Sequence, residues 1–220
     1  MIFLSYILDI KTPTYGNSSS FEKIQKSNIS LGDIANNSFI SSTVHIGTHI
    51  DMPYHFYKDG QTIEDFDASF WIFKKPLIIE IKQKELIINE NLISKLGLID
   101  DIGYDILIVK TGICELRDKK EFWEQNYGFH PNVASFLRDK FKTIKVLGFD
   151  SISISSWQHR VLGRESHKAF LNPENPILIL EDMNLVNVKE NTEFKEIIVA
   201  PLRIETCDGL PCTIFGRLND

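Results

Sequence analysis

The sequence predicts an α/β domain built on a mixed β-sheet. Short apolar runs rich in Ile, Leu and Val recur along the chain, and Pro, Gly, Asp or Lys bounds each of them. Such runs are typical of buried strands. Segments with a helical spacing of apolar residues lie between some of the runs, and this mixture of helices and buried strands indicates an α/β fold. We expect one compact domain over residues 1–220, because 220 residues suit a single core.

Six strands and two helices can be placed along the chain. The predicted strands cover residues 2–10, 77–81, 106–109, 144–149, 177–180 and 197–200. Pro76 and Pro176 precede two of them, and proline is tolerated where a strand begins. The first helix is predicted over 89–96, with Gly97 placed to end it. The second is predicted over 131–141, with Pro131 suited to its first turn.

Residues 11–43 are interpreted as a long N-terminal arm. The segment is rich in Ser, Asn and Gly, and it carries isolated apolar residues such as Ile24, Ile29 and Leu31. Long loops in compact domains are usually either functional or disordered. Because the apolar residues need a surface to pack against, we expect an ordered arm.

Composition narrows the classes of partner. A net charge of −6 argues against nucleic acid, since phosphate binding needs clustered Lys and Arg. The apolar N-terminus is shorter than the roughly 20 residues that span a bilayer, so no membrane partner is expected. Three cysteines and no recognisable signal peptide predict reduced thiols in a cytoplasmic protein.

The strongest chemical signal lies between His45 and His55. Three of the six histidines, together with Asp51, fall in this short segment. Imidazole and carboxylate are the usual protein ligands of zinc and related ions. In a strand, His45, His49, Asp51 and His55 would all point to one face. The segment therefore predicts a divalent metal site, with zinc favoured and manganese as the alternative, holding one or two ions per chain.

The spacing leaves two geometries open. A fully extended chain would place His45 and His49 about 13 Å apart, which is too far for both to bind one ion. Either the chain bends at Gly47-Thr48, or the site holds two metals that Asp51 bridges. Gly47 is compatible with both, because it has no side chain and permits unusual dihedral angles.

The motif resembles the signature of the cyclase family of hydrolases, which includes bacterial kynurenine formamidases (arylformamidases). It reads His-x-Gly-Thr-His-x-Asp-x-Pro-x-His-Phe and begins at His45. Weaker similarities follow in the family's order along most of the chain. They include Thr111-Gly112, Gly148-Phe149-Asp150-Ser151, His167 with Leu171, Glu181, and the segments that begin at Pro201 and Asp208.

The resemblance implies a fold and a set of roles. The fold is a mixed, barrel-like sheet flanked by helices, of the swivelling β/β/α type, usually assembled as a homodimer or larger homo-oligomer. The implied metal ligands are His45, His49, Asp51, His167 and Glu181. His55 is implied to transfer protons, and Glu181 to share in catalysis. His159 stays open as an alternative to His167, because the segment between His167 and Glu181 is longer than the family pattern.

The implied activity is hydrolysis of a small amide, such as an N-formyl compound, by metal-activated water. The chain has no Gly-x-Ser-x-Gly motif and no Cys near a His, so nothing supports a serine or cysteine nucleophile. One alternative is the opening of a lactone, lactam or other cyclic substrate on the same scaffold. Another is a non-catalytic metal-binding or ligand-binding protein. Tyr15-Gly16 stands where formamidases carry a Trp-Pro-Gly element, which indicates a different substrate pocket.

Overall fold

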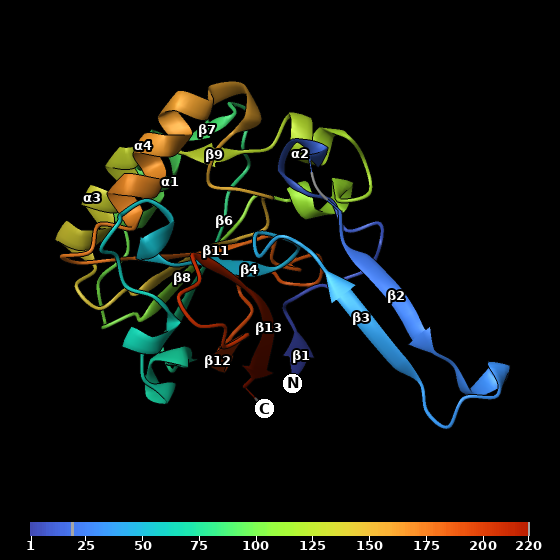
Figure 1. Cartoon of the computed structure of the whole chain (residues 1–220). Helices are drawn as coiled ribbons and strands as arrows, with labels where there is room; N and C mark the ends of the chain where they lie inside the picture. The colour runs from blue at the N-terminus through green and yellow to red at the C-terminus, as the bar shows by residue number, and fades with distance from the viewer. Residues whose placement is uncertain (19, 220) are drawn as a thin grey trace.

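The computed structural model describes residues 1–18 and 20–219, and its centre is one large mixed sheet (Figure 1). The strands follow the order β5-β12-β13-β4-β11-β10-β8-β6, and β1 pairs with β13 outside this path. Their bounds are β1 Ile2–Phe3, β4 His49–Asp51, β5 Ile72–Phe73, β6 Pro76–Glu80, β8 Ile106–Lys110, β10 Val146–Phe149, β11 Leu178–Glu181, β12 Phe194–Pro201 and β13 Gly209–Leu218.

The direction of the strands changes at β11. From β6 through β8 and β10 to β11 the pairs are parallel, whereas β11-β4, β4-β13, β13-β12 and β12-β5 are antiparallel. The sheet also curls, so that β12 and β6, close to its two ends, contact each other. The predicted mixed, barrel-like sheet is therefore confirmed.

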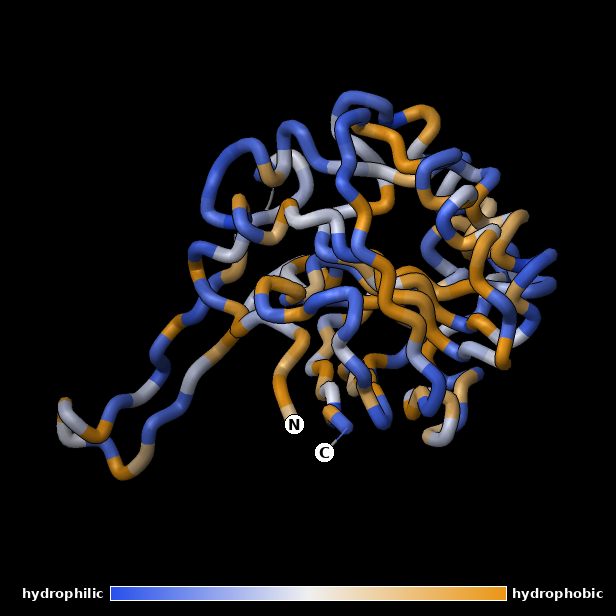
Figure 2. The backbone as a smooth tube through the Cα atoms, turned by 180° about the vertical axis from the view of Figure 1, so that it is seen from behind, coloured by the Kyte–Doolittle hydropathy of each residue, from blue (hydrophilic) through white to orange (hydrophobic). Residues whose placement is uncertain are grey.

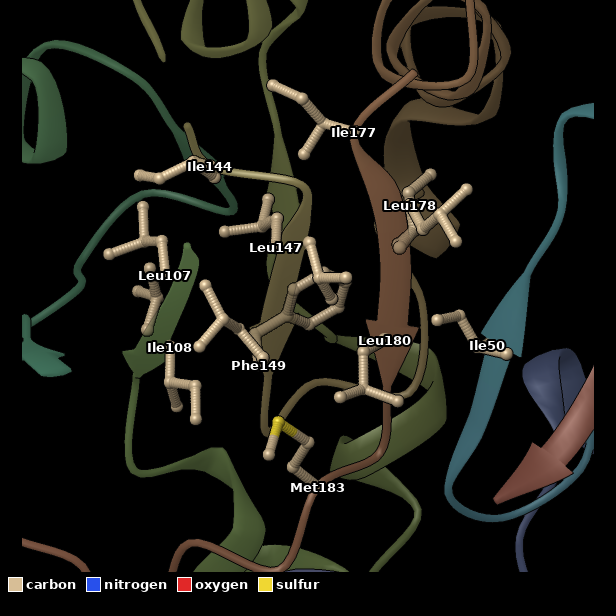
Figure 3. Close-up of a cluster of buried hydrophobic side chains, with 14 of the residues drawn as sticks. Ile50, Leu107, Ile108, Ile144, Leu147, Phe149, Ile177, Leu178, Leu180 and Met183 are labelled. Carbon is tan, nitrogen blue, oxygen red and sulfur yellow. The ribbon is translucent and has the colours of Figure 1, made fainter. Parts of the chain in front are cut away.

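The parallel strands form the core because they are buried on both faces. Such strands carry continuous apolar runs rather than alternating ones. Figure 3 shows the result, with side chains of β8, β10 and β11 packed together and Ile50 of β4 beside them. Leu107, Leu147 and Leu180 are fully buried there. Five of the six predicted strands lie in this sheet with small changes at their ends.

The first predicted strand is much shorter than expected. Only Ile2–Phe3 pairs with β13, and Ile7 is 89% exposed. Leu4 N still donates to Ile214 O, but the ladder ends there, and the Ser5 hydroxyl rather than a backbone carbonyl accepts from Ile214 N. A turn closed by Thr12 N donating to Asp9 O then leads the chain away from the sheet.

Four α-helices occur in the described residues: α1 Glu90–Gly97, α2 Glu121–Glu124, α3 Pro131–Lys140 and α4 Arg160–Phe170. α1, α3 and α4 lie on one side of the sheet, and α3 packs against both others (Figure 1). The helices predicted over 89–96 and 131–141 are confirmed as α1 and α3. Among the residues that the structure describes, no helix is long and apolar enough to cross a bilayer.

α4 was not predicted as a helix, and its sequence explains why. Its buried positions are Gly163, Ser166, His167 and Phe170, which have helical spacing but include one apolar side chain only. The 3.6-residue pattern exists, yet small and polar residues carry it. A search for apolar periodicity cannot detect such a helix.

Residues 22–41 form a hairpin that projects from the body. Strands β2 Glu22–Ser27 and β3 Asn37–Ser41 pair antiparallel, and the hairpin that they form extends away from the sheet (Figures 1 and 2). Phe21, at the base, is buried, whereas Ile24, Ile29 and Leu31 are exposed. The side chains of Ile24, Ile29 and Leu31 are therefore not covered by the described part of the chain. A second small sheet pairs β7 Ile87–Ile88 with β9 Gly128–Phe129.

Candidate metal centre

A sharp bend at Gly47 brings the first two histidines together. Gly47 has φ +56°, and the strand β4 begins only at His49. The ring centroids of His45 and His49 are 5.3 Å apart, far closer than an extended chain allows. A side chain at Gly47 would also collide with Leu8, since an added Cβ would lie 2.4 Å from its Cδ2. Of the two geometries that the sequence left open, the structure therefore has the bend at Gly47. The segment from His45 to His55 is not one continuous strand.

Four buried side chains converge at the inner end of the site. His49 and Asp51 come from β4, Glu181 from the paired strand β11, and His167 from α4. His49 Nε2 lies 3.3 Å from Glu181 Oε2 and 3.4 Å from Asp51 Oδ1. His167 Nε2 lies 3.5 Å from Asp51 Oδ2. Residues far apart in sequence thus present two imidazoles and two carboxylates to one point.

The hydrogen bonds of these histidines fix which nitrogen can bind an ion. His49 Nδ1 donates to Gly47 O, and His167 Nδ1 donates to Gly163 O, both over 2.8 Å. In the neutral rings, the lone pair is therefore on Nε2 and faces the carboxylates. Two such acceptors repel each other unless a cation lies between them. His49 Nε2 is buried and has no hydrogen-bond partner among the described residues, so this donor set fits a divalent metal.

At the outer end of the site, Asp208 accepts hydrogen bonds from two further histidines, His45 and His55. Asp51 Oδ1 and Asp208 Oδ2 accept from His45 Nδ1 and Nε2, over 2.8 Å and 2.9 Å. His55 Nδ1 donates to the same Asp208 oxygen over 3.1 Å. Asp51 therefore belongs both to a group with His45 and His55 and to a group with His49 and Glu181. A carboxylate in this position is able to bridge two ions.

The charges of this outer group are strongly coupled. Burial lowers the pKa of His45, but the charge of Asp51 and the hydrogen bonds with Asp208 and Asp51 outweigh burial and raise it to about 9. The hydrogen bond from His45 lowers the pKa of Asp208. For His55, burial has the largest effect and lowers the pKa. The carboxylates thus draw positive charge to His45, and a metal ion bound there would compete with its proton.

Backbone and hydroxyl donors orient Glu181. Its Oε1 accepts from Ile154 N over 2.7 Å and from the Ser153 hydroxyl over 3.3 Å, which leaves Oε2 turned toward His49. The next residue, Asp182, has φ +50° and forms a two-pronged ion pair with Arg117. This pair anchors the end of β11 beside the site.

Gly209 leaves the space that the His45 ring occupies. A Cβ added at Gly209 would lie 2.5 Å from His45 Cε1, closer than nonbonded atoms approach. Gly209 begins β13 and pairs with Asp51 across the sheet. The absence of a side chain at this position therefore lets β13 place Asp208 against both outer histidines.

All five residues proposed as ligands from the sequence meet at this site, with His55 beside them: His45, His49, Asp51, His167 and Glu181. His159 does not reach it, since it is exposed just before α4. The sequence interpretation missed Asp208 as a site residue. Its only signal was its place before Gly209 in a segment similar to the cyclase family.

The site opens into a cavity of about 300 Å³. The metal-centre residues form its inner end. The exposed Arg160 and Arg164 lie at its outer wall, Tyr15 lines it as well, and apolar side chains of Ile46, Phe56 and Ile152 contribute to the lining. Phe56 stacks on the His167 ring with centroids 4.5 Å apart, which holds that imidazole in place. The cavity therefore suits a small, partly apolar molecule.

Comparisons with known proteins identify a family and a shared fold. The family model described as "Putative cyclase" matches residues 2–156, more than half of the chain. A kynurenine formamidase of Bacillus cereus is 28% identical over 192 residues, covering 87% of this chain and 82% of that protein. The solved structure of isatin hydrolase A from Labrenzia aggregata superposes with a TM-score of 0.78 at 20% identity, covering 99% of this chain and 93% of that one. A structure described as a potential metal-dependent hydrolase with cyclase activity gives 0.76 at 22% identity, covering 98% and 96%.

Proposed function

Because this chain belongs to the cyclase family, we propose that it is a metal-dependent hydrolase of a small amide, of the kynurenine formamidase type. One observation carries the proposal. The Nδ1 atoms of His49 and His167 donate to backbone carbonyls, so the Nε2 atoms face the buried carboxylates of Asp51 and Glu181, and these carboxylates raise the pKa of both rings despite burial, which marks a point where positive charge is stabilised. Such an array is stable when a cation occupies its centre.

The ligands would be His49, Asp51, Glu181 and His167, with His45 joining from the outer group. Imidazole and carboxylate donors suit zinc, and manganese is the alternative. Because Asp51 is shared by the inner and outer groups, the site has donors for one or two ions. A bound divalent ion supplies Lewis acidity, which polarises a carbonyl and makes water nucleophilic at neutral pH.

His55 is the proposed proton-transfer residue. Its Nδ1 proton is donated to Asp208, so Nε2 is available, and its lowered pKa keeps the ring neutral. A neutral ring can accept the proton of the water that adds to the amide carbon. When the C–N bond breaks, the same proton can pass to the leaving nitrogen, giving a carboxylic acid and an amine. Glu181, whose Oε2 faces His49 Nε2 at 3.3 Å, is the second proposed catalytic residue.

Opening of a cyclic amide or lactone is the second candidate. A small cavity with apolar walls at Ile46, Phe56 and Ile152 accommodates a flat ring, and isatin hydrolase A shares the fold. Water adds to the carbonyl carbon in the same way, and the acid stays in one product with the amine released from a cyclic amide or the alcohol released from a lactone. A non-catalytic metal-binding protein would keep the ion but have no turnover.

Metal analysis and a substrate panel test the proposal together. We expect about one to two zinc or manganese ions per chain in protein purified without chelator. Metal-loaded protein should hydrolyse at least one class among N-formyl amides, lactones and cyclic amides. Failure to bind any divalent metal, even after reconstitution, would exclude the proposed site. Bound metal with no turnover across the panel would favour the non-catalytic alternative.

We also propose that the active form is a homodimer or larger homo-oligomer, in which the β2–β3 hairpin contacts a second copy. An isolated two-stranded hairpin is marginally stable in water. Here its tip exposes Leu31 at 83% and Ile34 completely. The body exposes a cavity of about 850 Å³ beside β1, whose mixed lining includes the apolar side chains of Phe3, Ile7 and Leu8. Two copies would bury both kinds of surface around one two-fold axis.

Light scattering of the purified protein should therefore give the mass of a dimer or larger assembly. Replacing Leu31 and Ile34 with Ser should weaken the assembly, since burying one such side chain is worth roughly 1.5–3 kcal/mol. Leu98→Ser is the matched control, because Leu98 is 89% exposed at the end of α1. A monomeric wild type, or a double variant that assembles like the control, would contradict this contact.

A further inference from the structure

Two arginines without acidic partners stand on the wall of the catalytic cavity. Arg160 and Arg164 both line it, and they are four residues apart on α4, so they lie on the same face of the helix. Among the residues that the structure describes, the arginines in ion pairs are Arg117 and Arg217. In a chain of net charge −6, two unpaired guanidinium groups beside the site form a local positive patch.

A tyrosine hydroxyl at the same wall also lacks a partner. The Tyr15 hydroxyl is buried and makes no hydrogen bond within the described residues. Burial raises the pKa of Tyr15 to about 12, so the hydroxyl keeps its proton and can donate it. A buried donor without an acceptor costs free energy unless a ligand supplies one.

Aromatic contacts hold these donors together. The ring of Tyr15 packs edge-on against Trp157, with centroids 5.0 Å apart. The Arg160 guanidinium lies over Trp157 as well, 4.8 Å from the ring. At Gly16, φ is +62° and an added Cβ would lie 2.2 Å from Trp157 Cζ3, so this turn needs glycine to fit against the tryptophan. The wall is thus a packed structure that links the segment before the hairpin to the start of α4.

We infer that Arg160, Arg164 and Tyr15 bind a carboxylate group of the substrate. The inference rests on the proposed hydrolase and narrows its substrates to small amides, open or cyclic, that carry a carboxylate. A guanidinium fork matches the two oxygens of a carboxylate, and a phenol supplies a third donor. The carboxylate would lie at the outer wall, while the amide to be cleaved extends past the apolar side chains to the metal centre. An uncharged carboxamide of the same shape offers one acceptor oxygen in place of two and no negative charge, and its NH2 group would face the guanidinium donors.

The test compares two substrates that differ only in charge. One is a formanilide with a carboxylate on its ring, and the other is the corresponding carboxamide. R160Q/R164Q should lower kcat/KM for the carboxylate by about 10- to 100-fold, mainly through KM, because each lost charge-assisted hydrogen bond has a large effect. Hydrolysis of the carboxamide should change little, and metal content should not change. K168Q is the control, since Lys168 is exposed on the same helix but does not line the cavity.

A binding measurement separates this inference from the proposed hydrolysis. Calorimetry with chelator-treated protein should show that benzoate binds and benzamide does not, and that R160Q/R164Q loses the benzoate binding. This pattern with no hydrolysis of either formanilide would support the subsite and count against the hydrolase. If wild type and R160Q/R164Q hydrolyse both formanilides equally, the arginines are solvated surface residues and the inference is overturned while the hydrolase stands.

Discussion

Replacing Asp51 with Asn should abolish metal binding and hydrolysis while leaving the fold intact. Asp51 is 1% exposed, and its two oxygens face His45, His49 and His167. Asparagine keeps the shape but removes the negative charge that three imidazoles share. Losing a residue that only supports a metal ligand typically lowers activity by up to about 10²-fold. Because Asp51 is proposed as a ligand itself, we expect kcat/KM to fall by more than that.

Elemental analysis and circular dichroism decide this prediction. The Asp51→Asn protein should retain the wild-type spectrum, because β4 is paired by its backbone with β11 on one side and β13 on the other. Asp100→Asn is the matched control, since Asp100 is exposed and does not line the cavity. A full complement of metal and normal turnover in the Asp51→Asn protein would show that Asp51 is not a ligand, and the proposed shared carboxylate would be wrong.

The sheet was predictable where its strands are buried on both faces. In β8, β10 and β11 every residue is buried, so an uninterrupted apolar run marked each strand. β4 carried no such mark, because three residues with two polar side chains resemble a loop as much as a strand. Its place between β11 and β13 depends on pairing with residues more than a hundred positions away, which periodicity cannot show.

Some residues of the site could likewise be predicted from the sequence, and others could not. The spacing of His45, His49 and Asp51 identified a metal-binding segment, and the family resemblance added His167 and Glu181. The resemblance favoured His167 over His159, and α4 gives the physical reason for that outcome. His167 lies on its buried face in the last turn, whereas His159 precedes its first turn and is exposed. Asp208, Arg160 and Arg164 could not be found from spacing, because only the start of β13 and the start of α4 bring them to the cavity. Tyr15 was marked by the family resemblance alone, through the position of Tyr15-Gly16.

Replacing His55 with Ala should lower kcat by about 10²–10⁴-fold, the usual contribution of a positioned acid or base, while metal content stays at the wild-type level. His55 belongs to the outer group, and its Nδ1 hydrogen bond goes to Asp208 rather than to a ligand of the inner group. The inner donors would keep their mutual arrangement when the ring is removed. The loss should therefore appear in turnover and in the pH profile, because the group that takes and returns the proton is gone.

His159→Ala is the matched control for this variant, because it removes an exposed imidazole outside the cavity and should leave both activity and metal unchanged. Small imidazole added to the His55 variant should restore part of the rate if proton transfer is what was lost. The contrast with Asp51 is the critical comparison, since that variant should lose its metal and gain nothing from imidazole. If the His55 variant loses metal to the same extent as the Asp51 variant, His55 is a ligand, and the proton must be carried by Glu181, whose Oε2 already faces His49 at 3.3 Å.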